Sequence, residues 1–405
     1  MRHYITFRGL KAPLRLEAAE SVLSLLPQVF TGWPHEPGPA DAVAAPFYSI
    51  TAGEDGLLVC ESHVDDRPLR RFDAVNAVCD AVSAVAFALP AEDNRLICLH
   101  AAAVEVAGRL VVFPNVQRAG KSTLSSALAR AGHPLFSDDV LPLSFTTDNL
   151  AWGRAMGIAP RLRLPLPGTI DPFFRAWVDT VGGPKNRQYQ YLCLPDQPAH
   201  GVVRPLGAFV ILDRRDDRTL PRLAPVSPDV AMDALLHQNF TRDRHSGDVL
   251  LAMASVLALR PVFRLTYDDL SEAVACLEQA FASWPDDLPP GPVSPDRRFR
   301  LAEFGAGGMA DRGIRGRVRQ RAGTVAAEIG GTLYLADAEG RAIHRMDAMA
   351  ALIWELLADP ALPQDIAADL AEAFPDTSPA RIAADLNALI DRLAREALVA
   401  SETGG

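Results

Sequence analysis

The 405-residue chain has little lysine and little cysteine, and it lacks a long uninterrupted apolar segment. Its five cysteines are scattered, odd in number and without CxxC spacing, which argues against a disulfide framework or a zinc site and favours buried thiols in a reducing cytoplasm. No run of about 18 apolar residues occurs and the N-terminus has no signal-peptide core, so neither a membrane span nor secretion is expected. The net charge of −10 argues against a general affinity for nucleic acid or anionic membranes.

The length is sufficient for two or three domains, and a composition that is 49% apolar and 22% charged is typical of globular proteins. Residues 1–90 predict a small α+β region. Its expected elements are a helix within 17–29, a hairpin of Phe47–Thr51 and Leu57–Ser62, and a helix over 72–89 that ends before Pro90. Further along, Gly207–Leu212 predicts a core strand, and helical patterns occur near 228–239 and 267–283.

Residues 284–319 are rich in proline, then in glycine and arginine, and this composition predicts an interdomain linker. Residues 320–405 predict a compact module. Its expected elements are a hairpin of Thr332–Ala336 and Ala342–His344, followed by helices at Ala348–Leu357, Gln364–Phe374 and Pro379–Ala397, the last with Ser378 as its N-cap.

The middle of the chain contains a segment with the spacing of a phosphate-binding loop: Asn115-Val116-Gln117-Arg118-Ala119-Gly120-Lys121-Ser122-Thr123. A predicted strand, Arg109–Phe113, precedes it and a predicted helix follows it. Asn115 stands where such loops normally begin with glycine, but asparagine tolerates a left-handed backbone, which weakens the match without removing it. A chance match is the alternative. The chain has only three lysines among its 40 basic residues, so a lysine at the position that needs a compact charge favours a functional loop.

Asp138 and Asp139 follow sixteen residues after Ser122. Phosphoryl transfer requires charge neutralisation, a metal, and a group that orients or deprotonates the acceptor. Lys121 can supply the first and Ser122 one Mg²⁺ ligand, while the aspartates can divide the other tasks because adjacent residues leaving a strand point in opposite directions. The alternative is a structural Asp-Asp turn.

Three further residues have two interpretations each. His100 falls in an apolar strand predicted over Leu96–Val106, where a histidine is more often a core residue than a catalyst. Lys185 lies in a predicted flexible loop, which is either a lid or a solvated surface loop. Arg161 alternates with leucine in a pattern typical of an exposed strand face, and a structural role is favoured for it.

Four segments and their spacing resemble HPr kinase/phosphorylase and its related kinases: Leu99–Val104, Gly108–Phe113, Ala119–Leu124 and Ala131–Val140. The similarity covers about residues 95–143 and extends weakly to about 280. It implies that His100 helps to position a catalytic aspartate, that Asp138 is the base, and that Asp139 lies toward the metal. The chain departs from the family pattern at Asn115 and at Gln117-Arg118, and the resemblance does not include the phosphorylase-associated loop, so reverse activity is not implied.

The C-terminal module has a different resemblance. The segments Leu333–Asp337, Gly340–His344 and Ala351–Leu357 look like the PqqD-like family, over about residues 320–403, although Asp347 stands where asparagine is common. That family binds leader peptides of ribosomally made natural products by adding a strand to the edge of a small sheet. The resemblance implies a module that supplies affinity rather than chemistry.

Together these features predict an α/β P-loop kinase core over 91–283, with a small α+β N-terminal region and a C-terminal winged-helix-like α+β module. The expected protein is a cytoplasmic kinase that uses ATP and Mg²⁺ to phosphorylate a Ser or Thr hydroxyl of a ribosomally synthesised precursor peptide. The expected nucleotide-binding residues are Asn115, Arg118, Ala119, Gly120, Lys121, Ser122 and Thr123. The expected catalytic residues are Asp138, His100 and Lys121, and the expected metal ligands are Ser122 and Asp139.

Two alternatives stay open: a small-molecule kinase whose tail docks a partner, and a non-catalytic, nucleotide-dependent peptide carrier. An intact lysine, hydroxyl and base argue against the carrier, which needs no base. No nucleic-acid or membrane partner is expected, and homo-oligomerisation stays open.

Overall fold

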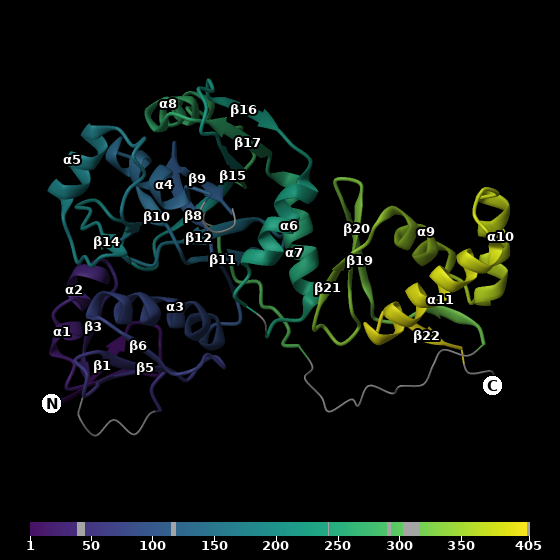
Figure 1. Ribbon diagram of the computed structural model, residues 1–405, viewed down its shortest axis with the longest axis horizontal. Coiled ribbons are helices and arrows are strands. Elements are labelled where there is room, and N and C mark those ends of the chain that lie inside the picture. Colours follow the sequence, from purple (N-terminus) through teal and green to yellow (C-terminus); the bar gives the residue numbers. More distant parts are fainter. Residues whose placement is uncertain (39–44, 115–118, 242, 290–292, 303–315, 403–405) are drawn as a thin grey trace. The chain divides into compact units, whose positions relative to one another are not determined.

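The computed structural model describes the chain except for residues 39–44, 115–118, 242, 290–292, 303–315 and 403–405 (Figure 1). The described chain forms two compact units. The first comprises Met1–Thr241 and Leu259–Arg298, and the second comprises Arg242–Ala258 and Phe299–Gly405.

A six-stranded sheet begins the first unit, with strand order β3-β1-β2-β4-β5-β6. Its strands are β1 (Arg2–Phe7), β2 (Leu14–Glu17), β3 (His35–Gly38), β4 (Tyr48–Ala52), β5 (Leu58–Ser62) and β6 (Arg70–Phe72). The expected hairpin is confirmed, because β4 and β5 pair antiparallel. The helical pattern of residues 17–29 folds as two short helices, α1 (Glu20–Leu23) and α2 (Leu26–Val29), and Pro27 lies in the first turn of the second one, where proline is tolerated.

The helix α3 (Ala74–Glu92) packs against this sheet. Asp73 caps its N-terminus by accepting a hydrogen bond from the backbone N–H of Asn76. The expected end before Pro90 is wrong: Pro90 lies within the last turn, where its fixed φ suits the helix and only one backbone hydrogen bond is lost. Among the described residues, α3 is the one helix long and apolar enough to cross a membrane, and 67% of its apolar window is buried inside the protein.

A mixed nine-stranded sheet forms the rest of the first unit, along the path β10-β8-β9-β15-β12-β11-β7, with β17 paired to β15 and β16 paired to β17. Its strands are β7 (Leu96–Leu99), β8 (Ala102–Val106), β9 (Arg109–Phe113), β10 (Leu135–Ser137), β11 (Leu141–Phe145), β12 (Ala151–Arg154), β15 (Val203–Arg214), β16 (Arg222–Pro225) and β17 (Val262–Tyr267). A two-stranded sheet of β13 (Arg161–Arg163) and β14 (Tyr189–Tyr191) and the helices α4 (Lys121–Arg130), α5 (Pro172–Val181), α6 (Pro228–Gln238) and α8 (Leu270–Ala280) complete the unit.

The sheet has two halves: one consists of β7, β11 and β12, and the other of β8, β9, β10, β16 and β17. The long strand β15 belongs to both halves. Its first residues pair antiparallel with β12, and its later residues pair parallel with β9 and β17. The chain passes between the two halves twice more, from β7 to β8 and from β10 to β11. The strand expected over Leu96–Val106 is therefore interrupted at His100 and Ala101.

The second unit combines α7 (Ser246–Leu259) with the C-terminal residues. Its elements are the pair β18 (Val318–Gln320) and β22 (Val399–Ser401), the sheet of β19 (Val325–Ile329), β20 (Thr332–Ala336) and β21 (Ile343–Arg345), and the helices α9 (Ala348–Leu356), α10 (Pro363–Ala373) and α11 (Pro379–Arg395). The hairpin and three helices expected here are present, whereas β19 and α7 were not predicted. The N-terminus of α7 holds the β20–β21 turn, because Ser246 N–H donates to the carbonyl of Gly340 over 2.8 Å.

Candidate active site

The two crossings between the sheet halves lie side by side and are joined by Ser137. The hydroxyl of Ser137, at the end of β10, donates a hydrogen bond of 2.8 Å to the carbonyl of Ala101, between β7 and β8. The same oxygen accepts from the backbone N–H of Asp139 over 3.2 Å. This contact brings the residues that follow β10 next to the residues that follow β7.

His100 lies at this junction and contacts Asp139: its Nε2 is 2.9 Å from Asp139 Oδ1. The last residue of α6 and the residues after it fix the position of the histidine. Its backbone N–H donates to the carbonyl of Gln238 over 2.8 Å, and its ring stacks on Phe240 with centroids 5.7 Å apart. The predicted partnership of the histidine with an aspartate is therefore made with the second residue of the pair.

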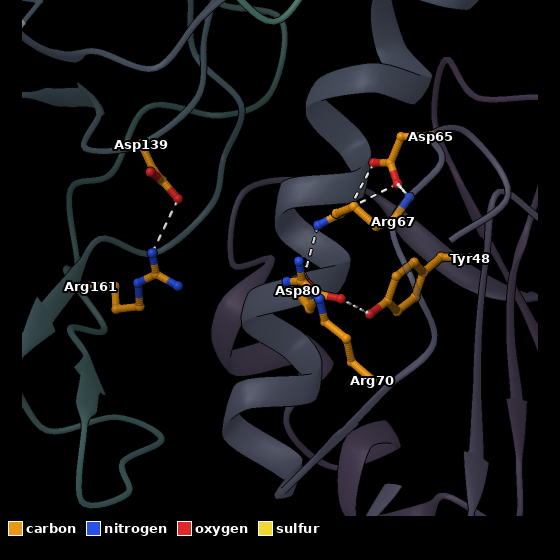
Figure 2. A network of polar contacts seen from close by, with 7 residues as sticks. All are labelled: Tyr48, Asp65, Arg67, Arg70, Asp80, Asp139 and Arg161. Atoms are coloured by element: carbon orange, nitrogen blue, oxygen red, sulfur yellow. Dashed lines mark hydrogen bonds and ion pairs between the residues drawn. The ribbon is translucent and has the colours of Figure 1, made fainter. Parts of the chain in front are cut away.

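The carboxylates of Asp138 and Asp139 are both held by Arg161, from β13. The backbone N–H of Arg161 donates to Asp138 Oδ2 over 2.8 Å, and its guanidinium lies 3.3 Å from Asp139 Oδ2 (Figure 2). The guanidinium also lies over the ring of Tyr189, 4.5 Å from its centroid. Arg161, interpreted from sequence as a structural strand residue, is thus part of the site, and its alternation with leucine carried no signal of that role.

Burial and neighbouring charges shift the pKa values of the two carboxyls in opposite directions. The pKa of Asp138 is raised, because the group is buried and lies beside the charge of Asp139. Burial alone would also raise the pKa of Asp139, but the hydrogen bond from His100 and the charges of Arg161, His100 and Lys121 hold it well below its usual range. Asp139 is therefore the carboxylate that stays ionised near neutral pH.

The segment predicted to bind phosphate leads into α4. Gly120 precedes the helix in a left-handed conformation with φ +91°, and a side chain there would place its Cβ 3.1 Å from the hydroxyl of Tyr267. Lys121 is the first helical residue and is only 6% exposed. Burial lowers the pKa of Lys121, and the nearby Asp139 and Asp138 oppose that shift.

Other residues of the predicted nucleotide site can be placed only in part. Ser122 and Thr123 lie in the first turn of α4, whose backbone N–H groups have no partner within the helix and suit an anion. Ala119 directly precedes Gly120, whereas Asn115 and Arg118 lie outside the described residues.

Mg²⁺ and ATP fit the residues that are present. Among the residues that the structure describes, no group of three or more His, Cys, Asp or Glu forms a metal site. Magnesium bound together with nucleotide phosphates needs only one or two protein ligands, which Ser122 and a carboxylate of the pair can supply. A buried ammonium at the N-terminus of α4, close to two carboxylates, matches the charges of such a complex.

A cavity of about 400 Å³ lies beside this cluster. It is lined by Arg70, Phe72, Asn76, Cys79, Asp80, Ser83, His100, Asp139, Val140, Arg161, Gln188, Tyr189 and Phe240. Asp139 and His100 contribute to its wall, and Asp138 does not. Lys185 lines a different cavity, together with Arg175 and Arg187.

Comparisons with known proteins give a family match for the C-terminal module and a set of structural neighbours. Residues 333–399 match the family of coenzyme PQQ synthesis protein D (PqqD), so the PqqD resemblance predicted for the C-terminal module is confirmed. No curated protein matches the chain. Among solved structures, the HPr(Ser) kinase/phosphatase from Coxiella burnetii is similar to 45% of this chain and 96% of its own, with 14% identity and a TM-score of 0.23. Because the identity and the TM-score are this low, the roles of residues are derived from the geometry of this chain and not from its structural neighbour.

Proposed function

We propose that the chain is an ATP-dependent kinase that phosphorylates a Ser or Thr hydroxyl of a ribosomally synthesised precursor peptide, which its PqqD domain recruits. The observation that carries this proposal is the cluster of Lys121, Asp138, Asp139 and His100 at the N-terminus of α4. The PqqD match supports a peptide as the partner, since that family supplies peptide binding rather than chemistry. Tethering the peptide raises its local concentration, so the catalytic site needs to recognise little sequence.

In this proposal the chain is a P-loop kinase with a winged-helix-like C-terminal module, and it acts in the cytoplasm. The domains proposed are an N-terminal region over 1–90, a catalytic domain over 91–283, a linker over 284–319 and a peptide-binding domain over 320–405. Bound Mg·ATP supplies the phosphoryl group and its charge neutralisation.

The chain's own residues divide the remaining work. The backbone N–H groups at the start of α4 and the ammonium of Lys121 hold the phosphates, and Ser122 and Asp139 are the metal ligands proposed. Asp138 is proposed as the base that accepts the proton of the acceptor hydroxyl. Asp139, which lines the cavity, is the rival for that role, since a base has to reach the hydroxyl.

Two variants separate these assignments. If Asp138 is the base, Asp138→Asn keeps Mg·ATP binding and loses transfer by about 10²-fold or more, because the shape is kept and the proton acceptor is removed. Asp139→Asn then raises the Mg²⁺ concentration needed for half-maximal rate. The opposite pattern would make Asp139 the base, and unchanged transfer and nucleotide binding in both variants would leave the pair as a structural turn.

The proposal itself is tested with the purified full chain, Mg·ATP and the peptide encoded by a short reading frame next to the gene. We expect a phosphopeptide in the mass spectrum, with the phosphate on a Ser or Thr. Transfer to alcohols or sugars that is equally fast without any peptide would favour a small-molecule kinase. ATP-dependent peptide binding without transfer would favour a carrier.

A further inference from the structure

The cavity beside Asp139 has two walls of different origin. His100, Asp139 and Arg161 form one wall, which includes the aspartate close to Lys121, and residues of β6 and α3 from the N-terminal region form the other. Figure 2 shows the polar residues of that region gathered around α3, together with Asp139, on the loop after β10, and Arg161, on β13. The N-terminal sheet thus contributes directly to the space that an acceptor would enter.

The size of the cavity limits what can enter it. About 400 Å³ is within the range of volumes found for small-ligand sites. A sphere of that volume is about 9 Å across, which an extended chain crosses in about three residues. An acceptor therefore enters as a short extended segment, with the groups flanking its hydroxyl in contact with the cavity wall.

Two charged residues in the wall formed by β6 and α3, Asp80 and Arg70, differ in how many polar partners they have. Asp80, on α3, is held by Arg67 at 2.9 Å and by the hydroxyl of Tyr48 (Figure 2). Arg67 also binds Asp65 through its Nε over 2.8 Å. Asp80 is thus already neutralised and hydrogen-bonded before Arg70 is considered.

Arg70 makes only a long contact with the same carboxylate oxygen, at 3.3 Å, and this is its one side-chain partner among the described residues. Its side chain is 40% exposed, whereas that of Asp80 is 12% exposed. A guanidinium has five donors, so most of those on Arg70 are available at the cavity wall. A planar set of donors of this kind matches a carboxylate.

We propose that Arg70 is a specificity-determining residue that binds a carboxylate of the acceptor, within about two residues of the hydroxyl that is phosphorylated. This proposal rests on the proposed kinase function and names the chemistry that its acceptor pocket selects. The carboxylate comes either from an acidic side chain or from the C-terminus of the peptide. In both cases the N-terminal region recognises the residues around the hydroxyl, while the PqqD domain binds a separate segment of the peptide.

Binding of three acetylated probe pentapeptides to the full chain tests this proposal. Each contains one Ser among Gly and Ala: one is neutral and amidated, one has Asp two positions after the Ser, and one has its free C-terminal carboxylate at that place. Apparent Kd values are measured by NMR titration with Mg²⁺ and a non-hydrolysable ATP analogue present. We expect at least one carboxylate peptide to bind about ten-fold more tightly than the neutral one, and the tighter of the two identifies the source.

Arg70→Gln should reduce that preference to within about two-fold, and Arg70→Lys should keep part of it. Arg71→Gln is the matched control, because this neighbouring arginine is bound to Asp55 at 2.8 Å and does not line the cavity. Equal binding of all three peptides by the wild type, or a preference that survives Arg70→Gln, would overturn the proposal. Transfer to the same peptides is scored separately: a carboxylate preference without transfer refutes the kinase and leaves the pocket assignment standing.

Discussion

At the residue scale, the ammonium of Lys121 is the group whose loss the site can least replace. It is buried at the first turn of α4, close to both carboxylates of the pair. We expect Lys121→Ala to lower the rate of phosphoryl transfer by roughly 10²–10³-fold, because a preorganised charge facing the phosphates is removed. The measurement is the initial rate of phosphopeptide formation at saturating Mg·ATP.

Lys11→Ala is the matched control for that variant, since the Lys11 side chain is 88% exposed and forms an ion pair with Glu92, far from the candidate site in the sequence. It should transfer phosphate at the wild-type rate. Both variants should unfold cooperatively on heating, which would show that a lower rate does not result from loss of the fold. A Lys121→Ala rate within a few-fold of wild type would remove this lysine from the mechanism.

His200 makes the stability of the first unit depend on pH. Its ring stacks on Trp33 with centroids 4.2 Å apart. Burial lowers its pKa to about 4, and the charges of Arg154 and Arg8 add to that shift. Because this pKa lies below that of an unfolded histidine, about 6.5, the unfolded chain binds more protons between the two values. The contribution of neutral, buried His200 to the free energy of unfolding is therefore complete above about pH 6.5 and is lost as the pH falls toward 4.

The loss should be on the order of 1–2 kcal/mol in the free energy of unfolding, since the ring keeps some contact with water. Urea denaturation at pH 7.5 and pH 5 measures it. His200→Gln cannot gain a proton, so its free energy of unfolding should fall less over the same interval. An identical decrease in both proteins would assign the pH dependence to carboxylates instead.

At the element scale, the start of α4 depends on Gly120. An alanine there has to adopt a left-handed φ of +91° and places its Cβ 3.1 Å from the hydroxyl of Tyr267. We expect Gly120→Ala to cost about 1–2 kcal/mol in stability and to weaken nucleotide binding, because the first turn of α4 moves. Chemical denaturation and titration with a fluorescent ATP analogue measure the two effects.

Gly132→Ala separates strain from steric contact. Gly132 follows α4 with φ +98°, and a Cβ at this position would have no neighbouring atom within 4 Å. This variant should lose a similar amount of stability and keep nucleotide affinity. If both variants bind nucleotide equally well, the geometry of Gly120 does not matter for the phosphate site.

Elements with a periodic pattern and a clear cap could be predicted from the sequence. α11 is an example: its apolar residues recur at helical spacing, and Ser378 caps it by accepting from the N–H of Arg381. α7 was missed because it is apolar nearly all round and shows no periodicity. The interruption at His100 was missed because it depends on contacts with the distant segment Gln238–Phe240, which no local pattern encodes.

The residues of the candidate site likewise fall into a group that could be predicted from the sequence and a group that could not. The order of loop, helix and aspartate pair is local in sequence, so its residues could be named in advance. Arg161 and Arg70 join the site through β13 and β6, elements far from the loop in the chain, and their role comes from tertiary packing. Sequence reasoning thus named Lys121, His100 and the two aspartates, and it missed Arg161, which contacts both aspartates, and Arg70, which is proposed for selection.

At the scale of the whole molecule, the C-terminal sheet and helices belong to a compact unit of their own, which also includes α7. The PqqD match lies entirely within this unit, and the candidate active site lies entirely within the other. In the proposed function, recognition of a leader and transfer of phosphate therefore belong to different parts of the chain. Such a division predicts that each can be lost separately.

Removing residues 320–405 should raise the apparent KM for a leader-bearing precursor by about 10²-fold or more and spare basal ATP hydrolysis. A module that pairs with a peptide backbone and fills one or two apolar pockets commonly binds at micromolar Kd, about −8 kcal/mol, and the tether converts that affinity into a high local concentration of acceptor. The control is the same peptide without its leader, for which the intact and truncated enzymes should have equal KM, because neither can tether it. Equal KM values for the leader-bearing peptide would refute recruitment by the PqqD domain and favour a small-molecule acceptor. A loss of ATP hydrolysis on truncation would show instead that the module, through contacts such as Ser246 with Gly340, supports the fold.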